Sequence, residues 1–289
     1  MNQQIFSRGS RLFLLLIHTL MSTNFLNKIV AVTGGTTGIG RALVDQLISS
    51  GAKVATCGRS AEKLSELKRE HVAKALYTHV ADVSIEDDCR RFINGTIEKF
   101  GGIDVLINNA GVSMRALVED TDIATLKKVM DINFWGTVYC TKFALDEIIK
   151  NKGTVAGISS IAGYRGLPGR SGYSASKHAV NGWLEALRTE MLDKGVNVLW
   201  AAPGFTTSNI RAVALNKDGK PQGESPMDEN KMMSSAECAT HILKAIEKRK
   251  RTLVLTFTGK RTVFMNKFFP GWADRLVKNF FFEKGELVR

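Results

Sequence analysis

The chain has 289 residues, of which 44% are hydrophobic and only 5 are proline. No internal repeat, low-complexity tract or linker divides it. We therefore expect one α/β domain with a substantial core rather than a repeat protein or two small domains. The net charge of +12 is concentrated at one end, because residues 244–289 hold twelve Lys or Arg and only four Asp or Glu residues. Such an asymmetry suggests a partner for the C-terminal end.

The cysteines and histidines give no sign of a metal site. The four cysteines, Cys57, Cys89, Cys140 and Cys238, are far apart and match no zinc-binding spacing. The five histidines show no ligand spacing either, so we predict no metal and reduced thiols in a cytoplasmic protein. The basic run 248–251 closes a predicted helix, and we expect no nucleic-acid partner.

An apolar run at 12–21 follows Arg8 and Arg11 near the N-terminus. At about ten residues it is too short to cross a bilayer, which needs ~20, and no small-residue cleavage site follows it. We interpret residues 1–20 as an extension that is either a mis-called start, with Met21 as the natural one, or a disordered arm. An arm that touches a membrane is the alternative.

Apolar runs rich in β-branched residues alternate along the chain with longer amphipathic stretches. The runs predict strands at 28–33, 53–57, 76–81, 104–107, 153–159, 196–201 and 252–256. The amphipathic stretches predict helices at 38–50, 61–70, 86–100, 123–150, 172–193 and 236–248. This alternation predicts one domain over residues 21–258, a parallel sheet with helices on both faces. Ligands bind beyond the carboxyl ends of the strands in such sheets.

A glycine-rich turn, Thr33-Gly-Gly-Thr-Thr-Gly-Ile-Gly40, joins the first predicted strand to the first predicted helix. Glycines let the backbone approach a pyrophosphate, and a helix N-terminus offers free N–H groups and a positive dipole. We therefore predict that a dinucleotide contacts Gly34, Thr36, Thr37, Gly38, Ile39 and Gly40.

The second strand ends in Gly58 and Arg59, where an acidic residue would hold the ribose 2′-hydroxyl of NAD. A guanidinium instead suits a 2′-phosphate, which it can bind through two hydrogen bonds. Arg41, just after the glycine turn, is expected to add positive charge nearby. The sequence therefore predicts NADP(H) rather than NAD(H).

Tyr173 and Lys177 are four residues apart on a predicted helix, so both side chains lie on one face. A lysine cation beside a phenol stabilises the phenolate and lowers a pKa that is ordinarily about 10. This pairing is typical of a proton donor and acceptor that works near neutral pH.

These motifs, together with Asn108-Asn-Ala-Gly111, Asn133, Ser160 and Pro203-Gly204, resemble the short-chain dehydrogenase/reductase family over residues 27–258. The resemblance implies a single Rossmann-type, doubly wound domain that is an NADP(H)-dependent oxidoreductase acting on a ketone or aldehyde and an alcohol. It implies catalytic roles for four residues: Ser160, Tyr173, Lys177 and Asn133, the last holding a water in a proton relay. It also implies a homodimer or homotetramer.

The same resemblance extends the cofactor site beyond the glycine turn and Arg59. It implies contacts from Asp82, Val83, Asn109, Ala110, Gly111, Tyr173, Lys177, Pro203 and Gly204, and from a hydroxyl among Thr206, Thr207 and Ser208. The alternative function is an NADP(H)-binding sensor or scaffold with little turnover. Keeping all four catalytic residues favours the enzyme.

Two segments remain beside this core. Residues 206–235 are polar, contain two glycines and two prolines, and follow a strand end, so we predict a substrate lid. Residues 259–289 form a basic aromatic tail, with Phe264, Phe268, Trp272, Leu276 and Phe280 at helical spacing and a break at Pro270-Gly271. Three interpretations stay open for the tail: peripheral membrane contact, a flap over the pocket or a subunit partner, and plain docking on the domain.

The substrate pocket is encoded only weakly. Its candidate walls follow strand ends and are mostly apolar, which indicates a hydrophobic substrate. They are Met114, Arg115, Ala162, Tyr164, Leu167 and Phe205.

Overall fold

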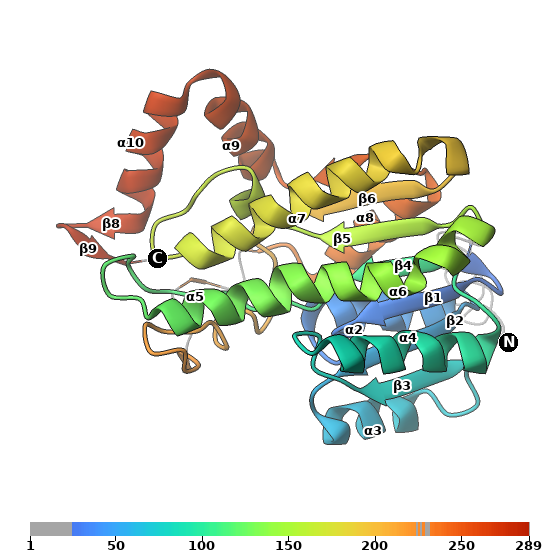
Figure 1. Ribbon diagram of the computed structural model, residues 1–289. Helices are drawn as coiled ribbons and strands as arrows, with labels where there is room; N and C mark the ends of the chain where they lie inside the picture. Colours follow the sequence, from blue (N-terminus) through green and yellow to red (C-terminus); the bar gives the residue numbers. More distant parts are fainter. Residues whose placement is uncertain (1–24, 224, 226, 229–231, 289) are drawn as a thin grey trace, which may run out of the picture.

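Seven parallel strands form the central sheet of the computed structural model, which describes residues 25–288 apart from 224, 226 and 229–231. The strands are β1 (Ile29–Thr33), β2 (Lys53–Gly58), β3 (Leu76–Val80), β4 (Val105–Asn108), β5 (Thr154–Ile158), β6 (Asn197–Ala202) and β7 (Thr252–Val254). Their spatial order is β3-β2-β1-β4-β5-β6-β7, which is doubly wound about β1 and β4 (Figure 1). The predicted Rossmann-type α/β fold is confirmed. The interpretations of residues 1–20 lie outside the described residues.

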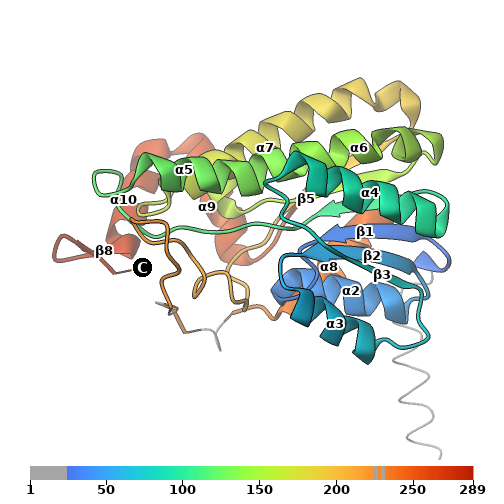
Figure 2. The same cartoon turned by 60° about the horizontal axis from the view of Figure 1, so that its bottom comes forward.

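Helices cover both faces of this sheet (Figure 2). One face carries α4 (Glu86–Phe100), α5 (Ile123–Met130), α6 (Gly136–Lys150) and α7 (Ser171–Glu190), and the other carries α2 (Gly38–Ser49), α3 (Ala61–Glu70) and α8 (Ser235–Glu247). Alternate residues of β1 enter different cores: Ala31 packs under the α4–α7 layer, and Val30 and Val32 pack against α2 and α8. Because both faces are covered, the central strands are apolar throughout.

The predicted helix 123–150 is helical throughout, but its hydrogen-bonding pattern changes in the middle. Between α5 and α6, residues Asp131–Trp135 form a π-helical turn. A π turn inserts an extra residue and often marks a functional site. Asn133 lies in the middle of it and is fully buried.

The C-terminal extension consists of two helices, α9 (Phe257–Phe268) and α10 (Pro270–Phe281), called the tail helices below, and a short hairpin of β8 (Phe282–Glu283) and β9 (Glu286–Leu287). The predicted break is confirmed, because α10 begins at Pro270. Proline tolerates the first helical turn but cannot continue a preceding helix. Figure 1 shows the tail helices (red) standing apart from the two helix layers. In the described part of the chain, no helix has the length and apolar character needed to cross a bilayer.

Candidate active site

A cavity of about 690 Å³ opens where the strands of the sheet end. All eighteen residues predicted to bind the cofactor line it: Gly34, Thr36, Thr37, Gly38, Ile39, Gly40, Arg59, Asp82, Val83, Asn109, Ala110, Gly111, Tyr173, Lys177, Pro203, Gly204, Thr206 and Ser208. Most of them follow the carboxyl end of a strand, where parallel strands bring separate loops to one edge.

The glycine turn lets the backbone pack more closely than a side chain would permit. A Cβ added to Gly40 would lie 2.2 Å from the Gly34 carbonyl oxygen and 2.4 Å from Asn109 Nδ2. Thr37, the N-cap of α2, makes no side-chain capping bond, and the first turn of α2 carries no acidic residue. The N–H groups at this helix start therefore fit an anion such as a pyrophosphate.

The end of the cavity next to β2 is cationic. Arg59, Ser60 and Lys63 all line it, and Arg59 and Lys63 are exposed. Lys63 was not predicted, although it lies in the first turn of α3, close in sequence to Arg59.

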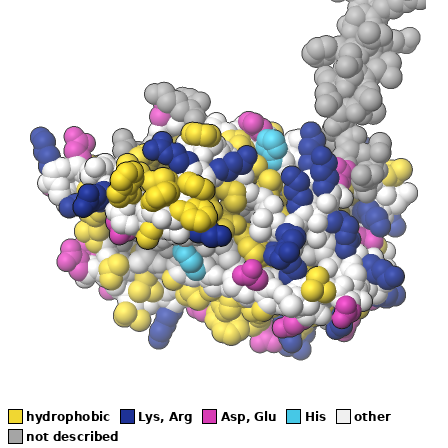
Figure 3. Space-filling view, turned by 90° about the horizontal axis from the view of Figure 1, so that it is seen from above, with side chains coloured by type: hydrophobic (Ala, Val, Ile, Leu, Met, Phe, Trp, Pro, Cys, Tyr) yellow, Lys and Arg dark blue, Asp and Glu magenta, His cyan; other side chains and the backbone are white. Residues whose placement is uncertain are grey.

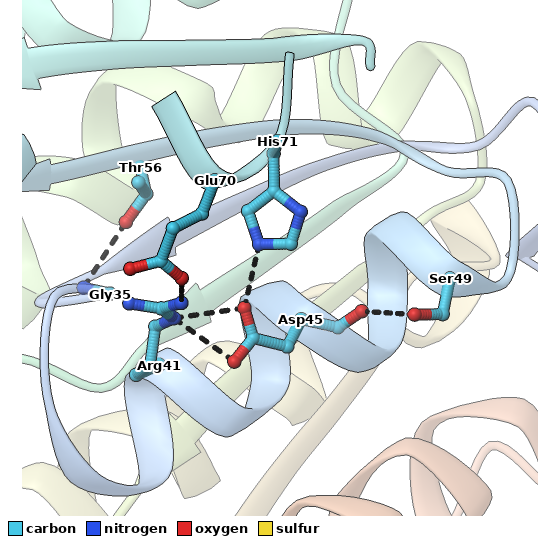
Figure 4. A network of polar contacts seen from close by, with 7 residues as sticks. All are labelled: Gly35, Arg41, Asp45, Ser49, Thr56, Glu70 and His71. Atoms are coloured by element: carbon cyan, nitrogen blue, oxygen red, sulfur yellow. Dashed lines mark hydrogen bonds and ion pairs between the residues drawn. The ribbon is translucent and has the colours of Figure 1, made fainter. Parts of the chain in front are cut away.

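Arg41 does not supply the positive charge that we expected there. Its Nε donates to both carboxylate oxygens of Asp45, at 2.8 and 3.0 Å, and its Nη2 bonds to Glu70 (Figure 4). His71 also contacts Asp45, at 2.8 Å. This network joins α2 to the end of α3, and two carboxylates offset the charge of Arg41.

Tyr173, Ser160 and Lys177 converge at the other end of the cofactor residues. Ser160 follows β5, and its side chain lies close enough to the Tyr173 hydroxyl to lower the pKa of the phenol as a hydrogen-bond partner. The Lys177 ammonium lies 5.7 Å from the centre of the Tyr173 ring and donates a 2.8 Å hydrogen bond to the Ile158 carbonyl. One helical turn of α7 thus presents a phenol and a cation to the same cavity.

Burial dominates the titration of this pair. It raises the pKa of Tyr173, while the hydrogen bond from Ser160 and the charges of Arg170 and Arg211 lower it. It also lowers the pKa of Lys177 to about 8. The cations whose charges lower the pKa of Tyr173 in this structure are therefore arginines, rather than the lysine that the sequence indicated.

Asn133 lies behind the cavity rather than on its wall. Its amide donates to the Val112 carbonyl and to Ser176 Oγ, both at 2.9 Å, and its Oδ1 accepts from the Val112 N–H at 2.8 Å. A Cβ added to Gly111 would lie 3.1 Å from Asn133 Oδ1 and 3.5 Å from Lys177 Nζ. Asn133 therefore joins the loop after β4 to α7.

The short chain dehydrogenase family profile matches residues 28–218. The chain belongs to this family. Dehydrogenase/reductase SDR family member 7B from Mus musculus is 34% identical to it over 271 residues, covering 91% of this chain and 84% of that protein. An 11-beta-hydroxysteroid dehydrogenase A from Arachis hypogaea is 30% identical over 285 residues, covering 93% and 80%.

A solved structure shares the fold of this chain. A short-chain dehydrogenase/reductase from Burkholderia phymatum, determined in complex with NAD, superposes with a TM-score of 0.76. The match covers 84% of this chain and 94% of that chain at 20% sequence identity, so it supports the fold alone.

The remaining walls of this short-chain dehydrogenase cavity come from the tail helices and the segment after β6. The tail contributes Thr258, Gly259, Arg261, Thr262, Met265, Ala273, Leu276, Val277, Phe280 and Phe281. Of the predicted apolar walls, Leu167 and Phe205 line the cavity, whereas Met114 and Ala162 are fully buried in the core and Tyr164 accepts a hydrogen bond from Trp200.

Three cavity arginines, Arg170, Arg211 and Arg261, were not predicted. Arg170 could have been found, since it precedes Tyr173 by one helical turn. Arg211 and Arg261 come from segments whose approach no local spacing reveals.

Proposed function

We propose that this short-chain dehydrogenase is an NADP(H)-dependent oxidoreductase that interconverts a ketone or aldehyde and an alcohol. The observation that carries the proposal is that Tyr173, Ser160 and Lys177 meet in one cavity, whose other end suits a dinucleotide. When bound, the nicotinamide would supply or accept the hydride.

The side chains of this chain would handle the proton and the developing charge. Tyr173 would donate its proton to the carbonyl oxygen, or accept one from the alcohol in the reverse direction. Ser160 would donate a hydrogen bond to the same oxygen, which strengthens as negative charge develops there. Lys177 would hold the nicotinamide ribose.

For Asn133 we propose a positioning role. Its amide ties the Val112 backbone to Ser176, the residue before Lys177, and so fixes the turn of α7 that carries Tyr173 and Lys177. The water-holding role stays a prediction.

Tyr173→Phe tests the proposal. Removing the hydroxyl is expected to reduce turnover of a carbonyl substrate by about 10²–10⁴-fold, because general acid catalysis contributes about that much. Affinity for NADPH, followed by fluorescence, should change little. Tyr139→Phe is the matched control, because Tyr139 lies on α6, away from the cavity, with its ring stacked on that of Trp135. If wild-type protein binds NADPH but turns over no member of a ketone and alcohol panel, the sensor or scaffold alternative holds.

NADP(H) is proposed over NAD(H) because Arg59 and Lys63 line the end of the cavity that the adenosine half would occupy. Arg59→Gln is expected to weaken NADPH binding about ten- to hundredfold, the value of a charge-assisted hydrogen bond, and to leave NADH binding nearly unchanged. Arg69→Gln serves as the control, because Arg69 is exposed in the last turn of α3, the helix that follows Arg59. Equal affinities of wild-type protein for NADPH and NADH would contradict the assignment.

We also propose a hydrophobic substrate, because α10 turns Ala273, Leu276, Val277, Phe280 and Phe281 toward the cavity. The segment 206–235 is proposed as the substrate lid, since its residues 206 and 208–211 line the same cavity. The likeness to other short-chain dehydrogenases supports a homodimer or homotetramer.

The outward side of the tail helices supports peripheral membrane contact by a cytoplasmic protein. Phe264, Phe268, Phe269 and Trp272 are all about half exposed or more. Figure 3 shows hydrophobic side chains gathered at this end of the molecule with Lys and Arg beside them. Aromatic rings and cations together suit the headgroup layer of an anionic membrane.

A further inference from the structure

Three arginines from different parts of the chain lie close together, and two of them line the cavity. Arg170 is the N-cap of α7, Arg211 belongs to the segment after β6, and Arg115 follows β4. Arg170 and Arg211 line the cavity. The three are close enough to interact, since the charges of Arg211 and Arg115 both lower the pKa of Arg170, in addition to the larger effect of burial.

Two of these arginines donate hydrogen bonds to backbone carbonyls. Arg115 Nη2 donates to the Leu287 carbonyl at 3.0 Å, and Arg211 Nη2 donates to the Thr206 carbonyl at 2.8 Å. Arg170 differs, because its guanidinium makes no hydrogen bond or ion pair with the described residues. Its Nε is buried without a partner, as that of Arg115 is, and its guanidinium lies 6.0 Å from the centre of the Phe281 ring. Among the described residues, no carboxylate contributes to the titration of Arg170.

Arg188 shows what a structural arginine looks like in this chain. It is buried, and its Nε donates to the Val198 carbonyl at 3.0 Å, its Nη2 donates to the Arg251 carbonyl at 2.7 Å, and the guanidinium lies 4.2 Å from the centre of the Trp200 ring. Arg170 has none of these backbone partners. A partly buried cation without protein partners is unfavourable unless something else compensates it, and here Arg170 lines a cavity.

The position of Arg170 relates it to the reacting group. Residues three apart in a helix share a face, so Arg170 lies one turn before Tyr173 on the side that faces the cavity. The charges of Arg170 and Arg211 are also felt by the Tyr173 phenol. Apolar side chains of α10 line the same cavity, among them Leu276 and Phe281, and the Phe281 ring lies beside the Arg170 guanidinium. The cavity therefore combines cations that act on the phenol with an apolar lining.

We propose that the substrate of this enzyme carries an anionic group, a carboxylate or a phosphate, close to its carbonyl or alcohol, and an apolar body beyond it. Arg170 binds the anionic group with Arg211 beside it, and α10 covers the apolar body. A guanidinium suits this role because it can give two parallel hydrogen bonds to either oxyanion. The inference rests on the proposed oxidoreductase function for the identity of the reacting group, but the anion site can be tested separately.

Binding without turnover is the first test. Decanoate, decyl phosphate and decanol share one apolar chain, and their affinities for the NADP(H)-loaded protein can be measured by calorimetry. We expect one or both anions to bind about ten- to hundredfold more tightly than the alcohol, the value of a charge-assisted hydrogen bond. The stronger of the two anions identifies the head group. Equal binding of all three would overturn the proposal.

Variants at one position then assign the site. Arg170→Met should abolish the preference for the anions, and Arg170→Lys should retain part of it, because it keeps the charge but loses the two-pronged geometry. Arg251→Met is the control, since this exposed arginine precedes the amino end of β7 and does not line the cavity. Thermal unfolding checks that each variant is folded. If folded Arg170→Met still prefers the anions, the assignment of Arg170 as the anion-binding residue is wrong.

Turnover separates this inference from the proposed function. A medium-chain oxo acid and its methyl ester are offered with NADPH, and wild-type protein should prefer the acid. If both are turned over without preference, the anion site is wrong and the oxidoreductase stands. If neither these nor any panel compound is turned over while decanoate binding still depends on Arg170, the anion site stands and the proposed function fails.

Discussion

Lys177 is an ammonium held almost entirely out of water. It is only 5% exposed, and among the described residues its ammonium donates one hydrogen bond, to the Ile158 carbonyl. Burial lowers the pKa of Lys177 to about 8, from an ordinary value of 10.5. Between these two values the unfolded chain keeps a proton that the folded chain has released, so folding becomes more favourable as the pH rises.

A pH series on Lys177→Met tests this. Below pH 8 wild-type protein bears the full cost of a buried cation, about 3 kcal/mol at 1.36 kcal/mol per pH unit. The variant avoids this cost, so its free energy of unfolding relative to wild type should be highest near pH 7. That advantage should shrink between pH 8 and 10.5. Urea unfolding without cofactor measures it, with the exposed Lys128→Met as control. A difference that does not change with pH would contradict the burial argument.

For single residues, the sequence predicted which residues lie at the cavity better than it predicted the charges around them. The cofactor residues fall on one cavity because strand ends meet at one edge whatever the loops contain. The charge of Arg41 was misjudged, because its partner Glu70 lies at the far end of another helix. The approach of Arg211 to Tyr173 is likewise a long-range contact that no spacing along the chain encodes.

The turn between β1 and α2 is the element on which the proposed cofactor binding depends. Gly38 has a φ of +55°, and the positions around it are packed against the loop after β4. A backbone that must lie this close to both a neighbouring loop and a pyrophosphate leaves no room for side chains.

Gly40→Ala should disrupt this element. The added methyl would overlap the Gly34 carbonyl, so we expect a loss of about 1–3 kcal/mol in the free energy of unfolding and weaker NADPH binding. Gly182→Ala is the matched control, because Gly182 lies in α7 with nothing within 4 Å of its added Cβ. Alanine there should stabilise the helix by up to about 1 kcal/mol. Equal stability of the two variants would refute the packing argument.

Elements were predicted well where local chemistry decides them. Pro270 separates α9 from α10 as expected, because proline cannot continue a helix. The π turn Asp131–Trp135 was not predicted, since its flanking helices keep their apolar faces on the sheet and one inserted residue hardly disturbs the pattern. Its cause is tertiary: Asn133 bonds the Val112 backbone and Ser176.

At the scale of the whole molecule, the tail is fixed to the domain by few polar contacts. Arg165 donates to Asn266 at 2.9 Å and pairs with Asp274, and Asn266 donates to the Tyr164 carbonyl at 2.8 Å. Because α10 is also a cavity wall, deleting residues 259–289 would damage the pocket and any membrane surface together. Point substitutions on the outward side separate the two.

Phe264→Ser combined with Trp272→Ser should weaken binding to vesicles rich in phosphatidylserine. These side chains are 55% and 67% exposed and do not line the cavity. Burying one such ring is worth about 1.5–3 kcal/mol, so affinity should fall about tenfold or more in co-sedimentation. Val118→Ser, at an exposed apolar residue outside the tail, is the control. If wild-type protein does not co-sediment with these vesicles, the tail is not a membrane-binding surface.

The double role of α10 as a cavity wall also bears on how specificity can change in this family. The proton-transfer residues and the cofactor turn belong to the sheet and its loops, whereas much of the apolar wall belongs to one helix that follows the last strand. Under the proposed function, exchanging the inward residues of α10 between relatives should therefore change which substrates bind and leave the proposed proton-transfer residues in place.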